Sequence, residues 1–159
     1  MTPPPTKGHL YPPIAHVRGG RAEATKDGWG PNRSRTELCD PRLGPDSLLG
    51  LDQVSHIEVV FHFHVDEQEP VETGARHPRH RADWPRVGIF AQRARMRPNR
   101  IGLSICRVLG VSGTTIEVEG LDAVDGTPVL DIKPVWSATL PRGELREPAW
   151  AQALMANYW

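Results

Sequence analysis

The sequence has little of the features that mark several specialised classes of protein. Two cysteines in 159 residues are too few for a disulfide framework, and they lack zinc-binding spacing. No apolar run approaches the roughly 20 residues of a membrane-spanning helix, and the first residues contain no apolar secretory signal. These absences disfavour a membrane protein, a disulfide-rich secreted scaffold and a classical zinc finger. We therefore expect a cytoplasmic chain, of a length that fits one domain.

Charge is balanced over the whole chain but not along it. The 19 basic and 19 acidic side chains give a formal net charge of zero, which argues against indiscriminate binding of nucleic acid. Sixteen of the basic residues are arginine, and nine of these lie between Arg76 and Arg107, where Asp83 is the only acid. Nine arginines and one aspartate give this stretch a net charge of +8. Because arginine binds carboxylates and phosphates in a bidentate manner, the stretch predicts a focused anion site.

Short strands dominate the predicted secondary structure. Alternating apolar residues and intervening turns indicate seven strands, at residues 12–17, 36–38, 55–65, 86–91, 101–111, 114–118 and 127–132. Short helices are expected at 45–51 and within 147–159. Strands and helices do not alternate, and neither a Gly-x-Gly-x-x-Gly motif nor a P-loop is present, which disfavours a Rossmann domain. The chain is therefore predicted to be all-β, either a barrel or a sandwich.

The strand predicted at 55–65 carries three of the histidines. Its period of two places His62 and His64 on one face with His56, opposite an apolar face. Two histidines at this spacing can chelate a metal, but we favour a polar, partly exposed strand face. One of these histidines can also line a pocket or act as a general base.

Two loops are long enough to suggest a function. The loop at 19–35 is rich in glycine and charge, and it places Trp29 between Gly28 and Gly30. Such a tryptophan either forms the wall of a pocket or folds back onto the core, and the sequence favours neither interpretation. The polar segment 66–83 shows no periodicity, and its length suggests either function or disorder.

Two further segments have the chemistry of binding sites. Residues 93–103 combine four arginines with a Pro98-Asn99 turn, which suits a phosphate or a carboxylate. Residues Asp125 to Pro128 read Asp-Gly-Thr-Pro, a turn expected to offer free N–H groups and a hydroxyl. Taken alone, that second segment is as well explained by a simple hairpin turn.

Several motifs occur together along the chain, and the last of them is long and specific. They are Ser55-His56 with Phe63-His64, Gly88-Ile89-Phe90-Ala91-Gln92-Arg93 with Arg97-Pro98-Asn99, Ile101-Gly102-Leu103-Ser104, Gly120-Leu121-Asp122, and Asp125-Gly126-Thr127-Pro128-Val129-Leu130-Asp131-Ile132-Lys133-Pro134. With these motifs, residues 13–134 resemble the TsaA-like family, also called the TrmO or VirR-like family.

The resemblance implies a fold and an activity. The fold is a single compact β-barrel of about seven strands at residues 12–137, with a flexible arm at 1–11 and a C-terminal tail, partly helical, at 138–159. The activity is methyl transfer from S-adenosylmethionine by a homodimer that binds this cofactor near the subunit interface. The best-known member of the family methylates N6 of threonylcarbamoyl-adenosine at position 37 of tRNA.

The resemblance also implies which residues form the site. The cofactor residues carried over by motif are His64, Val65, Arg93, Leu103, Asp125, Gly126, Thr127 and Pro128. Arg93 is expected to hold the methionine carboxylate, Leu103 to pack on the adenine, and His64 to act as a wall or a general base. Arg95, Arg97 and Arg100 are candidates for phosphate contacts with an RNA acceptor. No metal site is expected.

Two departures from the family leave the methyl acceptor open. Long members carry Pro-Arg-Gln-Pro-Gly where this chain has Lys26-Asp27-Gly28-Trp29-Gly30, so that part of the cofactor site does not transfer by residue. Arg100 also replaces the proline of the family's Arg-Pro-Asn-Pro, and the extra C-terminal domain of long members has no counterpart here. The alternatives are a methyltransferase acting on a small molecule, a non-catalytic cofactor-binding regulatory module and, ranked lowest, a histidine-metal hydrolase.

Overall fold

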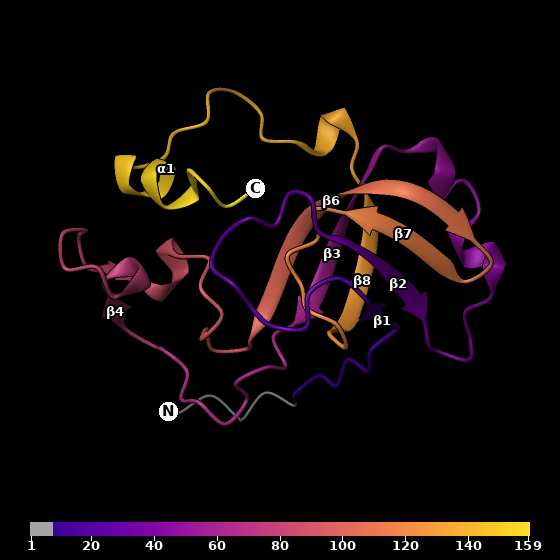
Figure 1. Cartoon of the computed structure of the whole chain (residues 1–159), viewed down its shortest axis with the longest axis horizontal. Helices are drawn as coiled ribbons and strands as arrows, with labels where there is room; N and C mark the ends of the chain where they lie inside the picture. The colour runs from indigo at the N-terminus through magenta and orange to yellow at the C-terminus, as the bar shows by residue number, and fades with distance from the viewer. Residues whose placement is uncertain (1–7) are drawn as a thin grey trace, which may run out of the picture.

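Six antiparallel strands close into a barrel in a computed structural model, which describes residues 8–159 (Figure 1). In chain order the elements are β1 (Ala15–Arg18), β2 (Arg33–Leu38), η1 (Pro45–Leu48), η2 (Leu51–Gln53), β3 (His56–His62), β4 (Ala75–Arg76), η3 (Pro78–His80), β5 (Val87–Gly88), η4 (Ile89–Ala91), β6 (Ile101–Ser112), β7 (Thr115–Glu119), β8 (Pro128–Pro134), η5 (Ser137–Thr139) and α1 (Ala149–Met155). The barrel order is β1-β2-β7-β6-β3-β8, while β4 and β5 form a separate two-stranded sheet. The all-β barrel is therefore confirmed. Residues 1–7 of the predicted arm lie outside the described residues.

The strand predicted at 86–91 is wrong. Only β5 is extended, it pairs with β4 outside the barrel, and the chain then turns into η4. The cause is the buried Gln92, whose side chain donates hydrogen bonds to the carbonyl oxygens of Arg76 and Val87 and so folds the segment back on itself. The turn also buries Ile89 while it leaves the neighbouring Phe90 80% exposed.

β3 lies between β6 and β8 in the barrel wall. Buried and outward-facing residues alternate along β3 as predicted. Ile57, Val59 and Phe61 are buried in the core, and their neighbours in the strand face outward. The strand ends at His62 and not at residue 65 as predicted. The Phe63 N–H donates to the carbonyl oxygen of Arg100, outside the strand ladder, and Asp66 turns the chain with a positive φ of 67°.

Three long connections leave the barrel at the same rim. β1, β3 and β7 end there, and β2, β6 and β8 begin there, as the registers Arg33↔Glu119, His62↔Ile101 and His16↔Pro128 show. The connections at 19–32, 63–100 and 120–127 therefore gather at one end of the barrel, which we call the site rim. The second of them includes β4, β5, η3 and η4.

The tail begins at the opposite rim, after β8, and returns along the outside of the barrel (Figure 1). It passes Glu58 and Ile105, which line a hollow together with residues 138–142. The predicted helix is confirmed as α1, which starts directly after Pro148. Within residues 8–159, no helix has the length and apolar character needed to span a membrane.

Gly102 of β6 provides a test of the packing inside the barrel. A Cβ at this position would lie 2.5 Å from two atoms of the Phe61 ring, so the ring and the strand backbone are in close contact. We expect Gly102→Ala to lower the free energy of unfolding by about 1–3 kcal/mol, because overpacking a core displaces its neighbours. Chemical denaturation measures this change. Gly110→Ala, on the same strand with Glu117 Oε2 4.0 Å from its Cβ, is the control. Equal stability of the two variants would contradict this packing.

Candidate functional site

The site rim brings together residues that are far apart in the sequence. His64 follows the end of β3, Leu103 is the third residue of β6, and Pro128 begins β8. Arg93 Nη2 donates a hydrogen bond of 2.7 Å to the carbonyl oxygen of Leu103, so Arg93 lies against the start of β6. Gly126 faces His64, whose Nε2 would be 3.8 Å from a Cβ at that position. Two pairs of predicted cofactor residues, Arg93 with Leu103 and His64 with Gly126, are therefore in contact or close to it.

The turn from Asp125 to Pro128 is held by its own backbone. The N–H groups of Asp125, Gly126 and Thr127 donate to the carbonyl oxygens of Arg21, Val17 and Val124. The Thr127 hydroxyl is buried and donates 2.7 Å to the Val124 carbonyl oxygen. The prediction that these groups are free is therefore wrong. Gly126 joins the turn to β1, Asp125 joins it to the first connection, and Thr127 closes the turn on Val124.

The turn exposes one acidic side chain, that of Asp125. Asp125 is exposed at the rim, and its Oδ1 accepts a hydrogen bond of 2.8 Å from the Gly19 N–H. The contact links the first connection of the site rim to the third. It leaves the second carboxylate oxygen of Asp125 available at the surface.

His64 is shielded enough to remain neutral near pH 7. Burial is the main cause that lowers its pKa from the usual 6.5, and the charges of His62 and His16 act in the same direction, whereas Glu67 opposes them. His62 has a partner of its own, since its Nε2 lies 2.8 Å from Glu67 Oε1. A neutral imidazole at this position can accept a proton.

The described residues contain no cluster of three or more His, Cys, Asp or Glu side chains that could hold a metal ion. Cys39 and Cys106 are both free thiols. Burial raises the pKa of Cys106 to about 12, with a further contribution from the charge of Asp122, so this thiol is not an activated nucleophile.

The three arginines predicted to contact RNA phosphates already have partners. Arg100 donates to the backbone carbonyl oxygens of Asp66, Glu67 and Glu69, and Arg97 donates to that of Gln92 at 2.8 Å. Arg95 forms an ion pair of 2.9 Å with Asp66. Arg97 and Arg100 are therefore used to shape the second connection, whereas Arg95 is exposed and can exchange its partner.

Trp29 folds back onto the protein, since it is only 3% exposed. The Arg21 guanidinium stacks on its ring at 4.7 Å, and the ring nitrogen donates to the Thr25 carbonyl oxygen at 3.2 Å. Arg79 holds the same loop from the second connection through Asp27, with N–O distances of 2.8 and 3.2 Å, and this hydrogen bonding lowers the pKa of Asp27. The loop at 26–30 is therefore fixed at the site rim.

Sequence reasoning missed the contribution of the tail to this rim. The Tyr158 hydroxyl donates to Asp122, and residues 157 and 158 accept hydrogen bonds from the loop at 26–30. An aromatic pair after a helix is the only signal in the sequence, and it does not indicate what the pair contacts.

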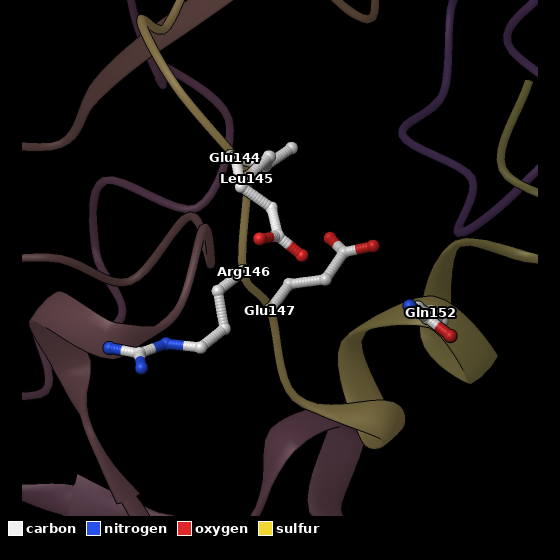
Figure 2. A pocket seen from close by; sticks show the side chains of 5 residues that line it. All are labelled: Glu144, Leu145, Arg146, Glu147 and Gln152. Atoms are coloured by element: carbon white, nitrogen blue, oxygen red, sulfur yellow. The ribbon is translucent and has the colours of Figure 1, made fainter.

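A hollow elsewhere on the tail contains none of the predicted residues. It is lined by Glu144, Leu145, Arg146, Glu147 and Gln152, and Figure 2 shows Arg146 pointing away from the two glutamates. These residues belong to the segment before α1 and to α1 itself, and this hollow is separate from the candidate site.

Comparison with known proteins agrees with this arrangement. The sequence model of the tRNA-methyltransferase O N-terminal domain matches residues 28–139. The Pseudomonas aeruginosa protein named "Putative S-adenosylmethionine-dependent methyltransferase RcsF" is 41% identical over 102 residues, which cover 64% of this chain and 44% of that protein. The human tRNA (adenine(37)-N6)-methyltransferase is 40% identical over 88 residues, covering 55% of this chain and 20% of its own length. The chain thus spans less than half the length of these two relatives.

A solved structure extends the similarity to three dimensions. The crystal structure of TrmO from Pseudomonas aeruginosa superposes with a TM-score of 0.71 at 33% identity, covering 88% of this chain and 61% of that one. The family match includes the second and third connections of the site rim and five of the six barrel strands completely. The chain therefore belongs to the family of the tRNA-methyltransferase O N-terminal domain.

Proposed function

We propose that this chain is an S-adenosylmethionine-dependent methyltransferase whose cofactor binds at the site rim. The observation that carries the proposal is the convergence of His64, Arg93, Leu103 and the turn at 125–128 from four separate segments of the chain. Relatives named for this cofactor and for methyl transfer support it.

The donors and acceptors at the rim suit this cofactor. Among the described residues, Arg93 pairs with no carboxylate and donates only to Leu103, so most of its N–H groups remain available for the methionine carboxylate. Asp125 supplies negative charge, which favours a nearby sulfonium. Gly126 has a φ of 84° and no side chain, which leaves space beside His64.

The residues of the rim then have distinct roles in the reaction. The bound cofactor supplies an electrophilic methyl group. Arg93 and the rigid turn at 125–128 orient the cofactor, which lowers the entropic part of the barrier. His64, neutral near pH 7, takes the proton that leaves the nitrogen of the acceptor.

The proposed acceptor is N6 of an adenosine at position 37 of tRNA. The names of the mammalian relatives support it. Of the three arginines predicted to contact phosphates, Arg95 is the best placed to do so, because it is exposed and its partner Asp66 can be exchanged.

The cofactor site is tested by replacing Arg93. We expect Arg93→Gln to weaken binding of S-adenosylhomocysteine by about ten- to a hundredfold in calorimetry, the typical value of a charge-assisted hydrogen bond. Arg146→Gln, which alters an arginine in a hollow that none of the predicted residues line, should bind like the unaltered chain. An unchanged affinity in Arg93→Gln would place the cofactor elsewhere.

A labelled methyl group then identifies the acceptor. The unaltered chain should transfer it from S-adenosylmethionine to tRNA. Transfer to small molecules alone would indicate a different acceptor, and binding without any transfer would support the regulatory alternative.

We also propose that the chain forms a homodimer through the outer face of β6. The outward side chains of β6 alternate with buried ones from residue 101 to residue 109. Ile101, Leu103, Ile105 and Leu109 are each about 40% exposed, and Arg107 is the one charged member of this row. Leu103 belongs both to this row and to the predicted cofactor site, which agrees with a cofactor bound near the subunit interface.

Ile105→Glu tests the dimer. A charge at the centre of the row should convert a dimer to a monomer in size-exclusion chromatography with light scattering, because it would be buried without a partner. Leu49→Glu, on an 88% exposed leucine between η1 and η2, should leave the dimer intact. A monomeric unaltered chain, or an Ile105→Glu variant that remains dimeric, would contradict this interface.

A further inference from the structure

Phe90 presents an aromatic ring to solvent on the second connection of the site rim. It is 80% exposed, whereas the other two phenylalanines, Phe61 and Phe63, lie in the barrel core or pack against it. Phe90 belongs to η4, next to the small sheet of β4 and β5, and Figure 1 shows β4 standing apart from the barrel wall. A single exposed apolar side chain is common on protein surfaces, so the orientation and surroundings of this ring are more informative than its exposure.

The backbone on both sides of Phe90 is fixed. The Ile89 N–H donates to the Gly74 carbonyl oxygen at 2.9 Å, and the Ile89 side chain is buried. The Gln92 N–H donates to the Ile89 carbonyl oxygen at 3.1 Å, and its buried side chain donates to that of Val87 at 2.9 Å. Because Ile89 and Gln92 are anchored inward, the turn is already ordered with the ring outside. A ligand that meets this ring therefore does not have to order the turn.

Two exposed arginines flank Phe90 in the chain. Arg86 Nη2 donates to the Ala75 carbonyl oxygen at 3.1 Å, and Ala75 pairs with Gly88, two residues before Phe90. Arg93 follows Phe90 by three residues and lies against the start of β6. Neither guanidinium pairs with a carboxylate among the described residues. This part of the connection therefore keeps positive charge that the described residues do not neutralise.

The charge of this surface favours one kind of occupant. Glu72 is an acid on the same side, but its Oε1 accepts a hydrogen bond of 2.7 Å from the Gly74 N–H. A second copy of the chain would place this surface against itself in a two-fold contact, and arginines would then face arginines. A single strand of nucleic acid instead offers a phosphate to a guanidinium and a base to an aromatic ring in every nucleotide.

We propose that Phe90 is a base-stacking residue for the RNA acceptor, and that Arg86 binds a phosphate of the same strand. The inference rests on the proposed function, because it concerns the same acceptor. The stacked base is an unpaired neighbour of the methylated adenosine. Phe90 lies close in the chain to Arg93, which is assigned to the carboxylate of the cofactor, whereas the sulfonium is assigned to the turn at 125–128.

The chemistry of RNA loops suits such a residue. Bases of a single-stranded loop can be splayed apart and stacked on aromatic side chains. Stacking of this kind tolerates any base, so it fixes the position of the strand and does not read its sequence. Phe90 therefore contributes to the affinity for RNA and not to the affinity for the cofactor.

Phe90→Leu tests this role, because leucine keeps an apolar side chain and has no aromatic face. We expect the affinity for an RNA hairpin with the sequence of a tRNA anticodon arm to fall by about tenfold, whereas Phe90→Tyr and Phe90→Trp should stay within about twofold of the unaltered chain. Fluorescence anisotropy with S-adenosylhomocysteine present measures this affinity. Tyr11→Leu is the matched control, because Tyr11 is 68% exposed and precedes β1, which starts at the opposite rim.

Hairpins that each lack one base of the loop identify the stacked position. The effect of Phe90→Leu should disappear for the hairpin without the stacked base and persist for the others, as in a double-mutant cycle. We expect this position to lie next to position 37. An effect that disappears only when the base at 37 itself is missing would contradict the assignment to a neighbouring base.

The salt dependence of the same binding tests Arg86. Each phosphate contact with a single strand contributes about 0.7 to the slope of log affinity against log salt concentration. Arg86→Gln should therefore lower the magnitude of this slope by about 0.7. Arg146→Gln, in the hollow before α1, should leave the slope unchanged. An equal slope in Arg86→Gln and the unaltered chain would overturn the phosphate contact.

The remaining outcomes separate this inference from the proposed function. Hairpin binding that is unchanged in Phe90→Leu, or equally weakened in Phe90→Tyr and Phe90→Trp, would overturn the stacking role. Weaker binding of S-adenosylhomocysteine by Phe90→Leu in calorimetry would make Phe90 a structural residue and would also overturn it. An unaltered chain that bound S-adenosylhomocysteine but no hairpin would overturn this inference and leave the cofactor site in place. Failure of the cofactor site would show instead as an unaltered chain that does not bind S-adenosylhomocysteine.

Discussion

The hydrogen bonds between β1 and β8 close the barrel, and the candidate site depends on this closure. Ala15 pairs with Val129 and His16 with Pro128, and the N–H groups of Ile14 and Val17 extend the contact to Val129 and Thr127. The same seam uses the N–H of Gly126. Because the turn at 125–128 is part of the seam, its position is fixed by the barrel and not by a ligand. A rigid turn of this kind favours a preorganised site.

Most arginines of the basic stretch between Arg76 and Arg107 bind other groups of the same chain. Of the nine arginines between Arg76 and Arg107, four form ion pairs among the described residues, and Arg97 and Arg100 donate to backbone carbonyl oxygens. Exposed pairs of this kind contribute little to stability, typically about 0–1 kcal/mol. Apart from the pair of Arg107 with Glu119, which joins β6 to β7, these contacts order the second connection. Arg93 differs from these arginines because it retains free donors while it lies at the rim.

Much of the barrel could be predicted from the sequence, because periodicity and turn residues act locally. The alternation of 57–61 and the helix after Pro148 depend on neighbouring residues, and both predictions are confirmed. The segment at 86–91 has the composition of a strand, but the buried side chain of Gln92 determines its conformation. The contact of Tyr158 with Asp122 joins positions 36 residues apart and had no local signal. Family motifs predicted which residues form the candidate site, whereas its internal hydrogen bonds join distant segments of the chain and have no signal in the sequence.

A crystal structure with S-adenosylhomocysteine tests the central claim most directly, which is that the site rim binds the cofactor. The account predicts the ligand at this rim, with its carboxylate on Arg93, its adenine against Leu103 and its sulfur near the turn at 125–128. A ligand bound in the hollow at residues 144–152, or at the opposite rim, would contradict the account.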